Sequence, residues 1–435
     1  MPQPSPIHDL IGVGLGPANL ALALALRESN ADFRILERKP CFGWHRGMLL
    51  ADATMQIPFL KDLVTQRDPT SPYSFLCYLQ ARGRLDAFVN LRAFHPTRRE
   101  FHDYLEWCAQ QVADQIAYSN TVVGIDVAPD ALPGRPVTEL VVRLRHGGFV
   151  RQVRTRAVSL ALGIAPRMPN GIPNDSRICH TANLLPYLEA AQPAPGARFA
   201  VIGGGQSAAE AVMHLLDRDP TAEVHAVMTA FGFLPADDTP FVNEVFAPGN
   251  VDAFYAMSPD MRAAVRERHA NTNYGVADPE IIAALYERTY REQVEGRRRL
   301  HLARLSRLVS AAPQQSGLEL HIEDCVGGNI RRLGVDHLIC GTGYEPVAPQ
   351  NLFSDALRAL VHVDAGGKPA LLRDYRVRTD PRLRAAIYLQ GDCEQTHGLS
   401  ATLLSNLAVR AGEIRDSFLR RAADTGNSDY AETGT

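Results

Sequence analysis

Two glycine-rich turns hold the residues whose types and spacing point most directly to chemistry. The first reads Gly12-Val13-Gly14-Leu15-Gly16-Pro17, and the second reads Gly203-Gly204-Gly205-Gln206-Ser207-Ala208. In such turns the glycines let the backbone approach a pyrophosphate, and the amides that open the following helix bind the phosphate oxygens. The two turns together predict two separate dinucleotide-binding sites.

The two turns differ in detail. Pro17 takes the third position of the G-x-G-x-x-G pattern in the first turn, and Glu37 follows where an acid can bind ribose hydroxyls. The second turn fits G-x-G-x-x-A, and Ser207 is placed to cap the next helix or to bind phosphate. Its partner strand ends near Met228-Thr229, with neither the acid that favours NAD nor the arginine that favours NADP. Local chemistry therefore leaves the choice of nucleotide open.

Each turn lies between an apolar strand and a helix, followed by a second strand. The expected strand, helix and strand span 10–13, 18–27 and 33–37 in the first unit, and 199–202, 207–216 and 223–228 in the second. Such βαβ units build parallel sheets covered by helices. The predicted fold class is therefore α/β, with two Rossmann-like dinucleotide-binding domains and a smaller helical substrate region.

Two dinucleotide sites in one chain suit an oxidoreductase that holds FAD permanently and receives hydride from NAD(P)H. Disulfide reductases of this plan need a redox-active pair of cysteines, and none of the seven cysteines lies in a Cys-x-x-Cys motif. The electrons must therefore reach another acceptor, most simply oxygen. A flavin-binding redox sensor without catalysis is the non-enzymatic alternative.

Loops and composition set the expected domain boundaries. We expect residues 1–195 to form the first part of the FAD-binding domain. Residues 196–335 should form the NAD(P)H-binding domain, with the helical substrate region at about 231–300, and residues 336–422 the second part of the FAD-binding domain. The strands that end in Gly341-Thr342-Gly343 and Gly391-Asp392 should return the chain to the first domain. The polar residues 423–435 are expected to form a disordered tail.

Composition excludes several functional classes. The formal net charge is −3, with 46% hydrophobic and 21% charged residues, so there is no general attraction to nucleic acid or anionic lipid. The scattered, odd-numbered cysteines predict neither a disulfide framework nor a metal site, and they favour the cytoplasm. The uncharged stretch 10–26 contains three glycines and Pro17, which argues against a membrane span.

Longer motifs resemble a known family, the flavin-dependent N-hydroxylating monooxygenases. Specifically, the chain resembles the L-ornithine and L-lysine N-monooxygenases that begin hydroxamate siderophore biosynthesis. The matching stretches span nearly the whole chain: Gly12–Leu20, Met55–Leu63, Arg67–Pro72, Gly203–Glu210, Pro240–Glu244, Asn271–Tyr274, Gly341–Tyr344 and Thr396–Ser400.

The resemblance implies a reaction. NAD(P)H reduces FAD, oxygen adds to give a C4a-hydroperoxyflavin, and the side-chain amine of L-ornithine attacks the distal oxygen. That amine must be neutral, although its solution pKa is about 10, and burial beside the flavin would lower it. L-Lysine is the close alternative, and a flavin monooxygenase acting on another amine, on sulfur or on a ketone remains open. We also expect a homo-oligomer, either a dimer or a tetramer.

The resemblance also implies roles for particular residues. Lys61 would pair with the substrate α-carboxylate, Asn243 and Asn273 would hold the α-amino and α-carboxylate groups, and Ser405 would lie near the substrate. Each residue also has a purely structural alternative. Lys61 would be a surface lysine, and Asn243 and Asn273 would cap turns. Ser405 would be a small packing residue within a final helix expected from Leu399 to Ala422.

The remaining implied contacts are with the cofactors. Seven residues fall at flavin-contact positions: Trp44, His45, Gln56, Val122, Thr402, Leu403 and Leu404. The nicotinamide nucleotide would meet the second turn and the segment that closes over it: Gly204, Gly205, Gln206, Ser207, Asn273 and Tyr274. Thr229 stands where several relatives have an arginine for the 2′-phosphate, so NADPH is expected but NADH is possible.

Overall fold

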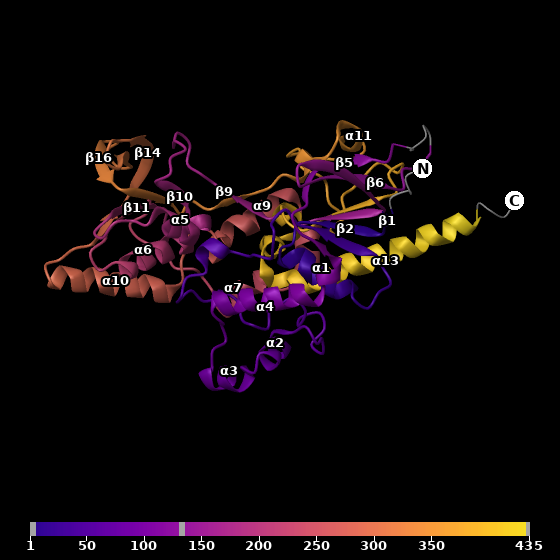
Figure 1. Cartoon of the computed structure of the whole chain (residues 1–435), viewed down its shortest axis with the longest axis horizontal. Helices are drawn as coiled ribbons and strands as arrows, with labels where there is room; N and C mark the ends of the chain where they lie inside the picture. The colour runs from indigo at the N-terminus through magenta and orange to yellow at the C-terminus, as the bar shows by residue number, and fades with distance from the viewer. Residues whose placement is uncertain (1–5, 130–134, 432–435) are drawn as a thin grey trace.

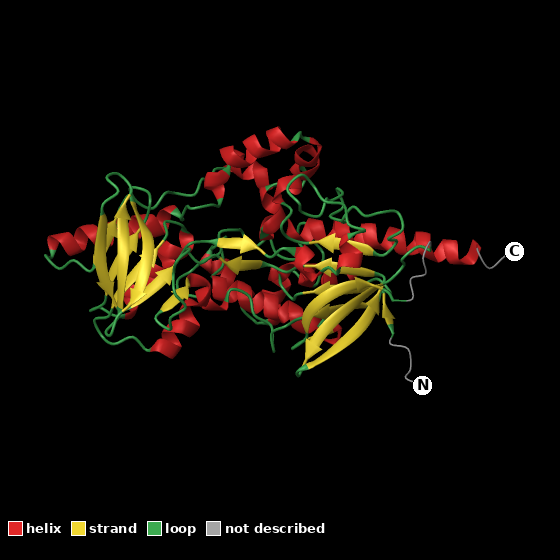
Figure 2. Cartoon of the chain, turned by 90° about the horizontal axis from the view of Figure 1, so that it is seen from above, coloured by secondary structure: helices red, strands yellow, loops and turns green. Residues whose placement is uncertain are grey.

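Two α/β domains and a helical segment between them make up the computed structural model, which describes residues 6–129 and 135–431 (Figures 1 and 2). The first domain contains the N-terminal glycine turn and the end of the chain. The second contains the other glycine turn. The predicted α/β class with two Rossmann-like domains is confirmed.

A parallel sheet with the strand order β19-β8-β2-β3-β4 forms the centre of the first domain. Its strands are β2 (Leu10–Val13), β3 (Phe33–Leu36), β4 (Ile116–Ala117), β8 (Ala157–Leu160) and β19 (Ala386–Leu389). They are almost continuously apolar because both faces are covered. Helices α1 (Pro17–Leu26) and α13 (Leu407–Ala431) pack against each other on this domain.

A second, mainly antiparallel sheet with the order β1-β7-β6-β5 completes the first domain. Its strands are β1 (Ile7–His8), β5 (Thr121–Val127), β6 (Leu140–His146) and β7 (Phe149–Thr155). The helices that follow the first turn unit are α2 (Phe75–Ala81), α3 (Leu85–Leu91) and α4 (Arg98–Gln111). The short helices α11 (Asp355–Arg358) and α12 (Glu394–His397) lie in the C-terminal part.

The second domain repeats the Rossmann plan in a parallel sheet with the order β10-β17-β11-β12-β13. Its strands are β10 (Ile178–His180), β11 (Arg198–Ile202), β12 (Glu223–Val227), β13 (Leu300–Ala303) and β17 (His337–Cys340). One face packs on an antiparallel sheet of β14 (Ser306–Pro313), β15 (Leu318–Asp324) and β16 (Ile330–Val335). Helices α5 (Leu184–Ala191), α6 (Gln206–Arg218) and α10 (Pro279–Val294) cover the other face.

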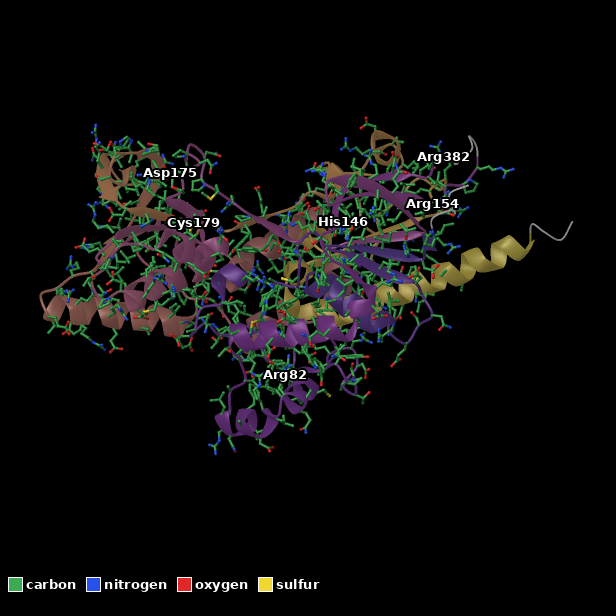
Figure 3. All side chains as sticks on the ribbon, in the orientation of Figure 1. Arg82, His146, Arg154, Asp175, Cys179 and Arg382 are labelled. Atoms are coloured by element: carbon green, nitrogen blue, oxygen red, sulfur yellow. The ribbon has the colours of Figure 1, made fainter. Side chains whose placement is uncertain are left out.

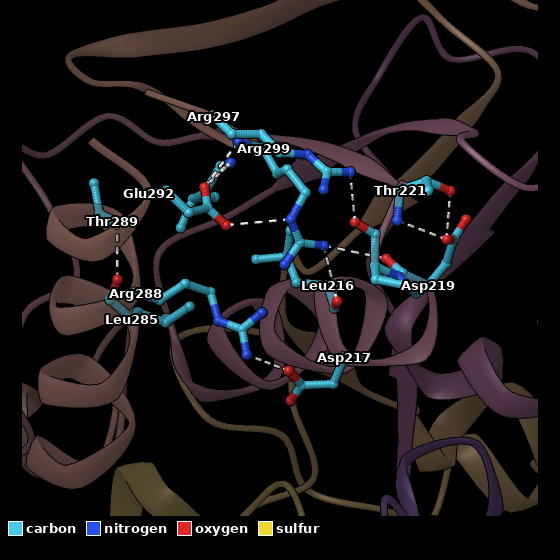
Figure 4. Close-up of polar contacts among 12 residues, drawn as sticks. Leu216, Asp217, Asp219, Thr221, Leu285, Arg288, Thr289, Glu292, Arg297 and Arg299 are labelled. Atoms are coloured by element: carbon cyan, nitrogen blue, oxygen red, sulfur yellow. Dashed lines mark hydrogen bonds and ion pairs between the residues drawn. The ribbon is translucent and has the colours of Figure 1, made fainter. Parts of the chain in front are cut away.

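The C-terminal end of α10 is fixed to this sheet by charged groups (Figure 4). The buried carboxylate of Glu292 accepts hydrogen bonds from the backbone N–H groups of Arg299 and Leu300, at 2.8 and 3.0 Å. The Arg299 guanidinium in turn donates to the carbonyl oxygens of Leu216 and Asp219. Arg299 is therefore a structural residue of the second domain.

The strand pairing corrects the predicted domain boundaries at 196 and 335. β10 precedes residue 196 and β17 follows residue 335, yet both belong to the second sheet. Figure 3 likewise shows Asp175 and Cys179 in the second domain. The strand that ends at Cys340 therefore does not return the chain to the first domain, whereas β19 does. The chain crosses between domains on an antiparallel pair, β9 (Ile164–Pro166) and β18 (Tyr344–Pro346).

The segment between the domains is helical, as predicted. It contains α7 (Pro240–Asn243), α8 (Asn250–Ala256) and α9 (Pro259–Arg268). Helices α8 and α9 pack against α12 of the first domain, whereas α10 packs against α6 of the second. The predicted substrate region at 231–300 is therefore divided between the two domains.

The C-terminal part differs from the prediction in two ways. The expected single helix from Leu399 begins as the 3₁₀ turns η7 (Leu399–Thr402) and η8 (Leu404–Asn406), and α13 starts only at Leu407. α13 then continues to Ala431 and projects past the first domain (Figure 1). The prediction of a disordered tail is therefore wrong for 423–431, because extending a formed helix adds one hydrogen bond for each residue fixed. Residues 432–435 lie outside the described residues.

The uncharged stretch 10–26 forms β2, the glycine turn and α1. Among the helices that the structure describes, none is both long enough and apolar enough to cross a membrane.

Candidate active site

The first glycine turn is held tightly between two strands of the parallel sheet. Gly14 has a φ of +90°, and a Cβ atom there would stand 2.5 Å from the carbonyl oxygen of Ala161. The Glu37 carboxylate closes the turn from the other side, since it accepts hydrogen bonds from the N–H groups of Leu15 at 2.6 Å and Lys39 at 2.9 Å. The predicted ribose-binding acid therefore lies directly against the turn.

Both helices that follow the glycine turns lack side-chain caps. The N-cap residues are Gly16 for α1 and Gly205 for α6, and neither can offer a capping oxygen. A Cβ atom on Gly16 would meet nothing within 4 Å, so this part of the turn faces open space. The open helix ends fit two pyrophosphate groups. The predicted capping role of Ser207 is wrong, because Gly205 occupies the N-cap position.

The second turn is packed as closely as the first. Gly203 has a φ of +133°, and a Cβ atom there would clash with the carbonyl oxygen of Gly341. A Cβ atom placed on Gly204, in contrast, would have no neighbouring atom closer than 3.8 Å. Nothing in the turn itself discriminates between NADH and NADPH.

The predicted flavin-contact residues lie on several segments of the first domain. Trp44 and His45 stack edge to face at 4.6 Å, and His45 occupies the left-handed region with a φ of +49°. Strain of this kind in a non-glycine residue clusters at binding sites. Thr402, Leu403 and Leu404 lie where η7 passes into η8, and Val122 lies at an irregularity in the pairing of β5 with β6.

A buried polar atom beside these segments supports a bound group. Asn406, at the end of η8, is only 1% exposed, and its Oδ1 atom has no hydrogen-bond partner among the described residues. An unpaired buried acceptor costs free energy unless a ligand or water supplies a donor. Together with the uncapped α1, it indicates that the first domain fits FAD.

A chain of polar side chains joins the two domains beside the second turn. Asp278 is the N-cap residue of α10, but its carboxylate does not cap that helix. It accepts from Gln56 of the first domain at 2.7 Å and from Gln206 of the second at 2.9 Å. Gln206 Oε1 also accepts from the Asp278 N–H at 2.7 Å. Burial raises the pKa of the Asp278 carboxyl, and the Gln56 hydrogen bond opposes that shift.

This series of polar side chains ends in a buried ion pair across the same interface between the two domains. Gln206 donates to Glu210 at 2.9 Å, and Arg98 of α4 binds the Glu210 carboxylate through both guanidinium ends at 2.7 and 2.8 Å. The side chains of Arg98 and Glu210 are only 11% and 5% exposed. We call these residues the domain clamp: Gln56, Asp278, Gln206, Glu210 and Arg98.

Lys61 lies in a loop next to Asp62, whose carboxylate is fully occupied by backbone N–H groups. The buried Asp62 carboxylate accepts from the N–H groups of Val64, Thr65 and Phe75 at 2.6 to 2.9 Å. The Lys61 ammonium forms no ion pair or hydrogen bond within the described part of the chain, although it is partly buried. Desolvation lowers its pKa. Such an ammonium group is ready to pair with an anion that comes from outside.

The asparagine segments lie against the C-terminal part of the first domain. Asn243 ends α7 and donates to the carbonyl oxygen of Asp238 at 2.7 Å. Tyr274, beside Asn273, donates its hydroxyl hydrogen to Glu394 at the start of α12, and Thr402 donates to the same carboxylate at 2.5 Å. Burial and the Glu394 carboxylate raise the pKa of Tyr274.

The structure links some of the predicted site residues through a shared hydrogen-bond partner, whereas the substrate contacts of the others stay predictions. Gln56 is joined to Gln206 through Asp278, and Tyr274 to Thr402 through Glu394. Ser405 is 2% exposed in η8. The roles of Lys61, Asn243, Asn273 and Ser405 toward the substrate stay predictions. Sequence reasoning missed four connecting residues: Arg98, Glu210, Asp278 and Glu394.

One cluster outside this region has the composition of a metal site. Glu223, His225 and His301 have ligand atoms within 4.8 Å of one another on β12 and β13. The two imidazole rings stack at 4.6 Å, which is the spacing of neighbouring strands. Burial, His301 and the positive charges of Arg331 and Arg198 lower the pKa of His225 to about 4. The same positive charges oppose a bound cation, so we assign no metal here.

Comparison with known proteins decides the family. Residues 6–346 match the family model described as L-lysine 6-monooxygenase/L-ornithine 5-monooxygenase. The chain belongs to this family. The predicted resemblance is thereby confirmed.

Relatives named for L-ornithine and relatives named for L-lysine are both similar to this chain over nearly their full length. The L-ornithine N(5)-monooxygenase of Burkholderia cepacia is 42% identical over 409 residues, 91% of each chain. The ornithine N-hydroxylase of Kutzneria sp. 744, solved with reduced FAD, NADP+ and L-ornithine, is 43% identical with a TM-score of 0.92, over 96% of this chain and all of that one. The L-lysine 6-monooxygenase of Pseudomonas syringae is 32% identical with a TM-score of 0.82, over 95% and 99%.

Proposed function

We propose that this protein is an FAD-dependent L-ornithine N-monooxygenase that hydroxylates the side-chain amine with NADPH and O2. The N-hydroxy product suits hydroxamate siderophore or related natural-product biosynthesis. Ornithine is preferred to lysine because the Burkholderia and Kutzneria enzymes, both named for ornithine, are 42% and 43% identical, against 32% for the lysine enzyme. When bound, FAD reduced by NADPH supplies activated oxygen.

The observation that carries the substrate proposal is the unpaired Lys61 ammonium. A zwitterionic amino acid brings a carboxylate that this ammonium can bind with a charge-assisted hydrogen bond. Asn243 and Asn273 would then hold the rest of the α-carbon end, and Ser405 would lie near the substrate. A fixed α-carbon end lets chain length place the reacting amine.

The cofactor residues follow from the two turns. The first turn, Glu37 and the α1 N-terminus would hold the FAD pyrophosphate and ribose, with Gln56 along the flavin. Gln56 is already held by Asp278, so the domain clamp would fix its position relative to the second turn. Tyr274, held by Glu394, would close over the nicotinamide nucleotide.

Lys61→Ala should raise KM for L-ornithine roughly 10- to 100-fold, because a hydrogen bond to a charged group contributes about 1.5–3 kcal/mol. Reduction of the flavin by NADPH should stay within about twofold, because Lys61 is proposed to bind the amino acid and not the nucleotide. Putrescine, which lacks the α-carboxylate, serves as the control substrate, and its turnover should be the same in both proteins. Steady-state kinetics with both amines measures this, and an unchanged KM for ornithine would remove Lys61 from the site.

A substrate comparison tests the proposed function itself. Hydroxylamine product should form with L-ornithine at a near-equal ratio to NADPH consumed, and less efficiently with L-lysine. Without an amine, NADPH oxidation should yield hydrogen peroxide instead. A protein that holds FAD but forms no N–O bond on any of these amines would be the redox sensor, and a better turnover of lysine would reverse the substrate assignment.

We further propose that the protein works in the cytoplasm as a homo-oligomer, either a dimer or a tetramer. All seven cysteines are unpaired, which suits a reducing compartment. Light scattering coupled to size-exclusion chromatography of the FAD-loaded protein measures the oligomeric state, and a monomer at micromolar concentration would contradict it.

A further inference from the structure

The second domain has no evident partner for the 2′-phosphate of NADPH at the expected position. In Rossmann domains that bind NADP, an arginine near the end of the second strand of the unit accommodates this phosphate. Here β12 is that strand, and Thr229 follows its end. A threonine hydroxyl can accept or donate one hydrogen bond, but it carries no charge. Discrimination between NADPH and NADH must therefore come from another residue, or be absent.

The neighbouring strand brings an arginine to the same edge of the sheet. β12 and β13 are parallel, and their pairing ends with Val227 opposite Ala303. Arg304 follows β13 directly. Because the carboxyl ends of parallel strands form the nucleotide-binding edge of such a sheet, Arg304 and Thr229 lie beside each other at that edge.

Backbone hydrogen bonds hold the two strand ends together beyond the sheet. The N–H of Leu305 donates to the carbonyl oxygen of Ala230 at 3.1 Å, and the N–H of Ser306 donates to that of Met228 at 2.8 Å. The Ser306 hydroxyl donates to the carbonyl oxygen of Arg304 at 2.8 Å. Arg304 is therefore on a fixed backbone segment that faces residues 228–230.

The Arg304 guanidinium is uncommitted, unlike those of the arginines nearest to it in the chain. Arg299 is bound by the Glu292 carboxylate and two carbonyl oxygens. Arg307 is bound through two hydrogen bonds by Glu323, at 2.8 and 3.0 Å. Arg304 is exposed and makes no side-chain hydrogen bond or ion pair with any residue that the structure describes.

We propose that Arg304 binds the 2′-phosphate of NADPH and replaces the arginine that is missing at Thr229. Guanidinium groups bind phosphate oxygens through parallel hydrogen bonds, which suits a phosphate at the rim of an open site. This inference rests on the proposed use of NADPH, and it makes β13, in place of β12, the source of nucleotide selectivity.

The test measures nucleotide binding to the FAD-loaded protein by calorimetry. Arg304→Ala should weaken binding of NADP+ and of adenosine 2′,5′-bisphosphate roughly 10- to 100-fold. Binding of NAD+ and 5′-AMP, which lack the 2′-phosphate, should change by less than about twofold. Arg307→Ala is the matched control, because it removes a charge from the same segment that Glu323 already neutralises, and it should leave all four affinities unchanged.

A rescue experiment separates phosphate binding from a general loss of positive charge. Adding Thr229→Arg to the Arg304→Ala protein should restore the preference for NADP+ over NAD+, because the new guanidinium would stand at the end of β12. An unchanged ratio of NADP+ to NAD+ affinity in Arg304→Ala would overturn the proposal, as would equal affinities in the unmodified protein. These measurements use no amine, so they succeed or fail independently of the assignment of ornithine.

Discussion

Gly14→Val should give a protein that does not retain flavin. The backbone of Gly14 has a φ of +90°, where β-branched residues are strained, and even a Cβ atom would stand 2.5 Å from the Ala161 carbonyl oxygen. Conformational strain of this kind alone costs of order 1–3 kcal/mol. The clash is with backbone, so the turn must move away from β8 and lose the geometry that a pyrophosphate needs. The absorbance ratio of flavin to protein after purification, and after incubation with excess FAD, measures the loss.

Two other glycines separate the causes of this effect. Gly83 also has a positive φ, +65°, but its Cβ would meet nothing within 4 Å, so Gly83→Ala should carry the strain and keep the flavin. Gly16→Ala should weaken FAD binding without straining the backbone, because its Cβ would enter the space that the pyrophosphate needs. A yellow Gly14→Val protein with a normal flavin content would contradict this account of the turn.

The elements around each glycine turn could be predicted because their signals are local. An apolar run, a glycine turn and a helical pattern lie within about 30 residues, as in any βαβ unit, and the structure places β2, α1 and β3 close to the expected bounds. The sheet to which a later strand belongs is not a local property. β17 has the same apolar character as β19, but its partners β10 and β11 are fixed only when the chain folds. This explains why the predicted boundaries at 196 and 335 place β10 and β17 in the wrong domain.

The site shows the same division between local and long-range information. Gly14 and Gly203 stand out because a turn requires them, whereas Asp278 looks like an ordinary N-cap residue before Pro279. Its carboxylate is instead taken by Gln56, 222 positions earlier in the chain. Glu394 is likewise an unremarkable acid until Tyr274 and Thr402 are found to share it. Such partners could not be read from spacing, because their contacts depend on how the two domains pack.

Glu210→Ala should destabilise the protein strongly, because Glu210 is one partner of the buried ion pair in the domain clamp. It would leave the Arg98 guanidinium, 11% exposed, without its carboxylate. Removing one partner of a buried ion pair costs about 3–5 kcal/mol, because the remaining charge is neither solvated nor paired. Gln206 would lose a partner as well, so the nicotinamide domain should be held less firmly beside Gln56.

We expect this loss to appear both in stability and in hydride delivery. The FAD-loaded Glu210→Ala protein should release flavin at a lower temperature, and stopped-flow reduction by NADPH should be slower while KM for ornithine stays unchanged. Glu287→Ala is the matched control: its pair with Arg291 is 65–70% exposed, and exposed helical pairs contribute only about 0.3–0.5 kcal/mol. The double variant Arg98→Met/Glu210→Leu should recover much of the stability, since it removes both buried charges. Equal stability of Glu210→Ala and the unmodified protein would show that the ion pair does not hold the domains together.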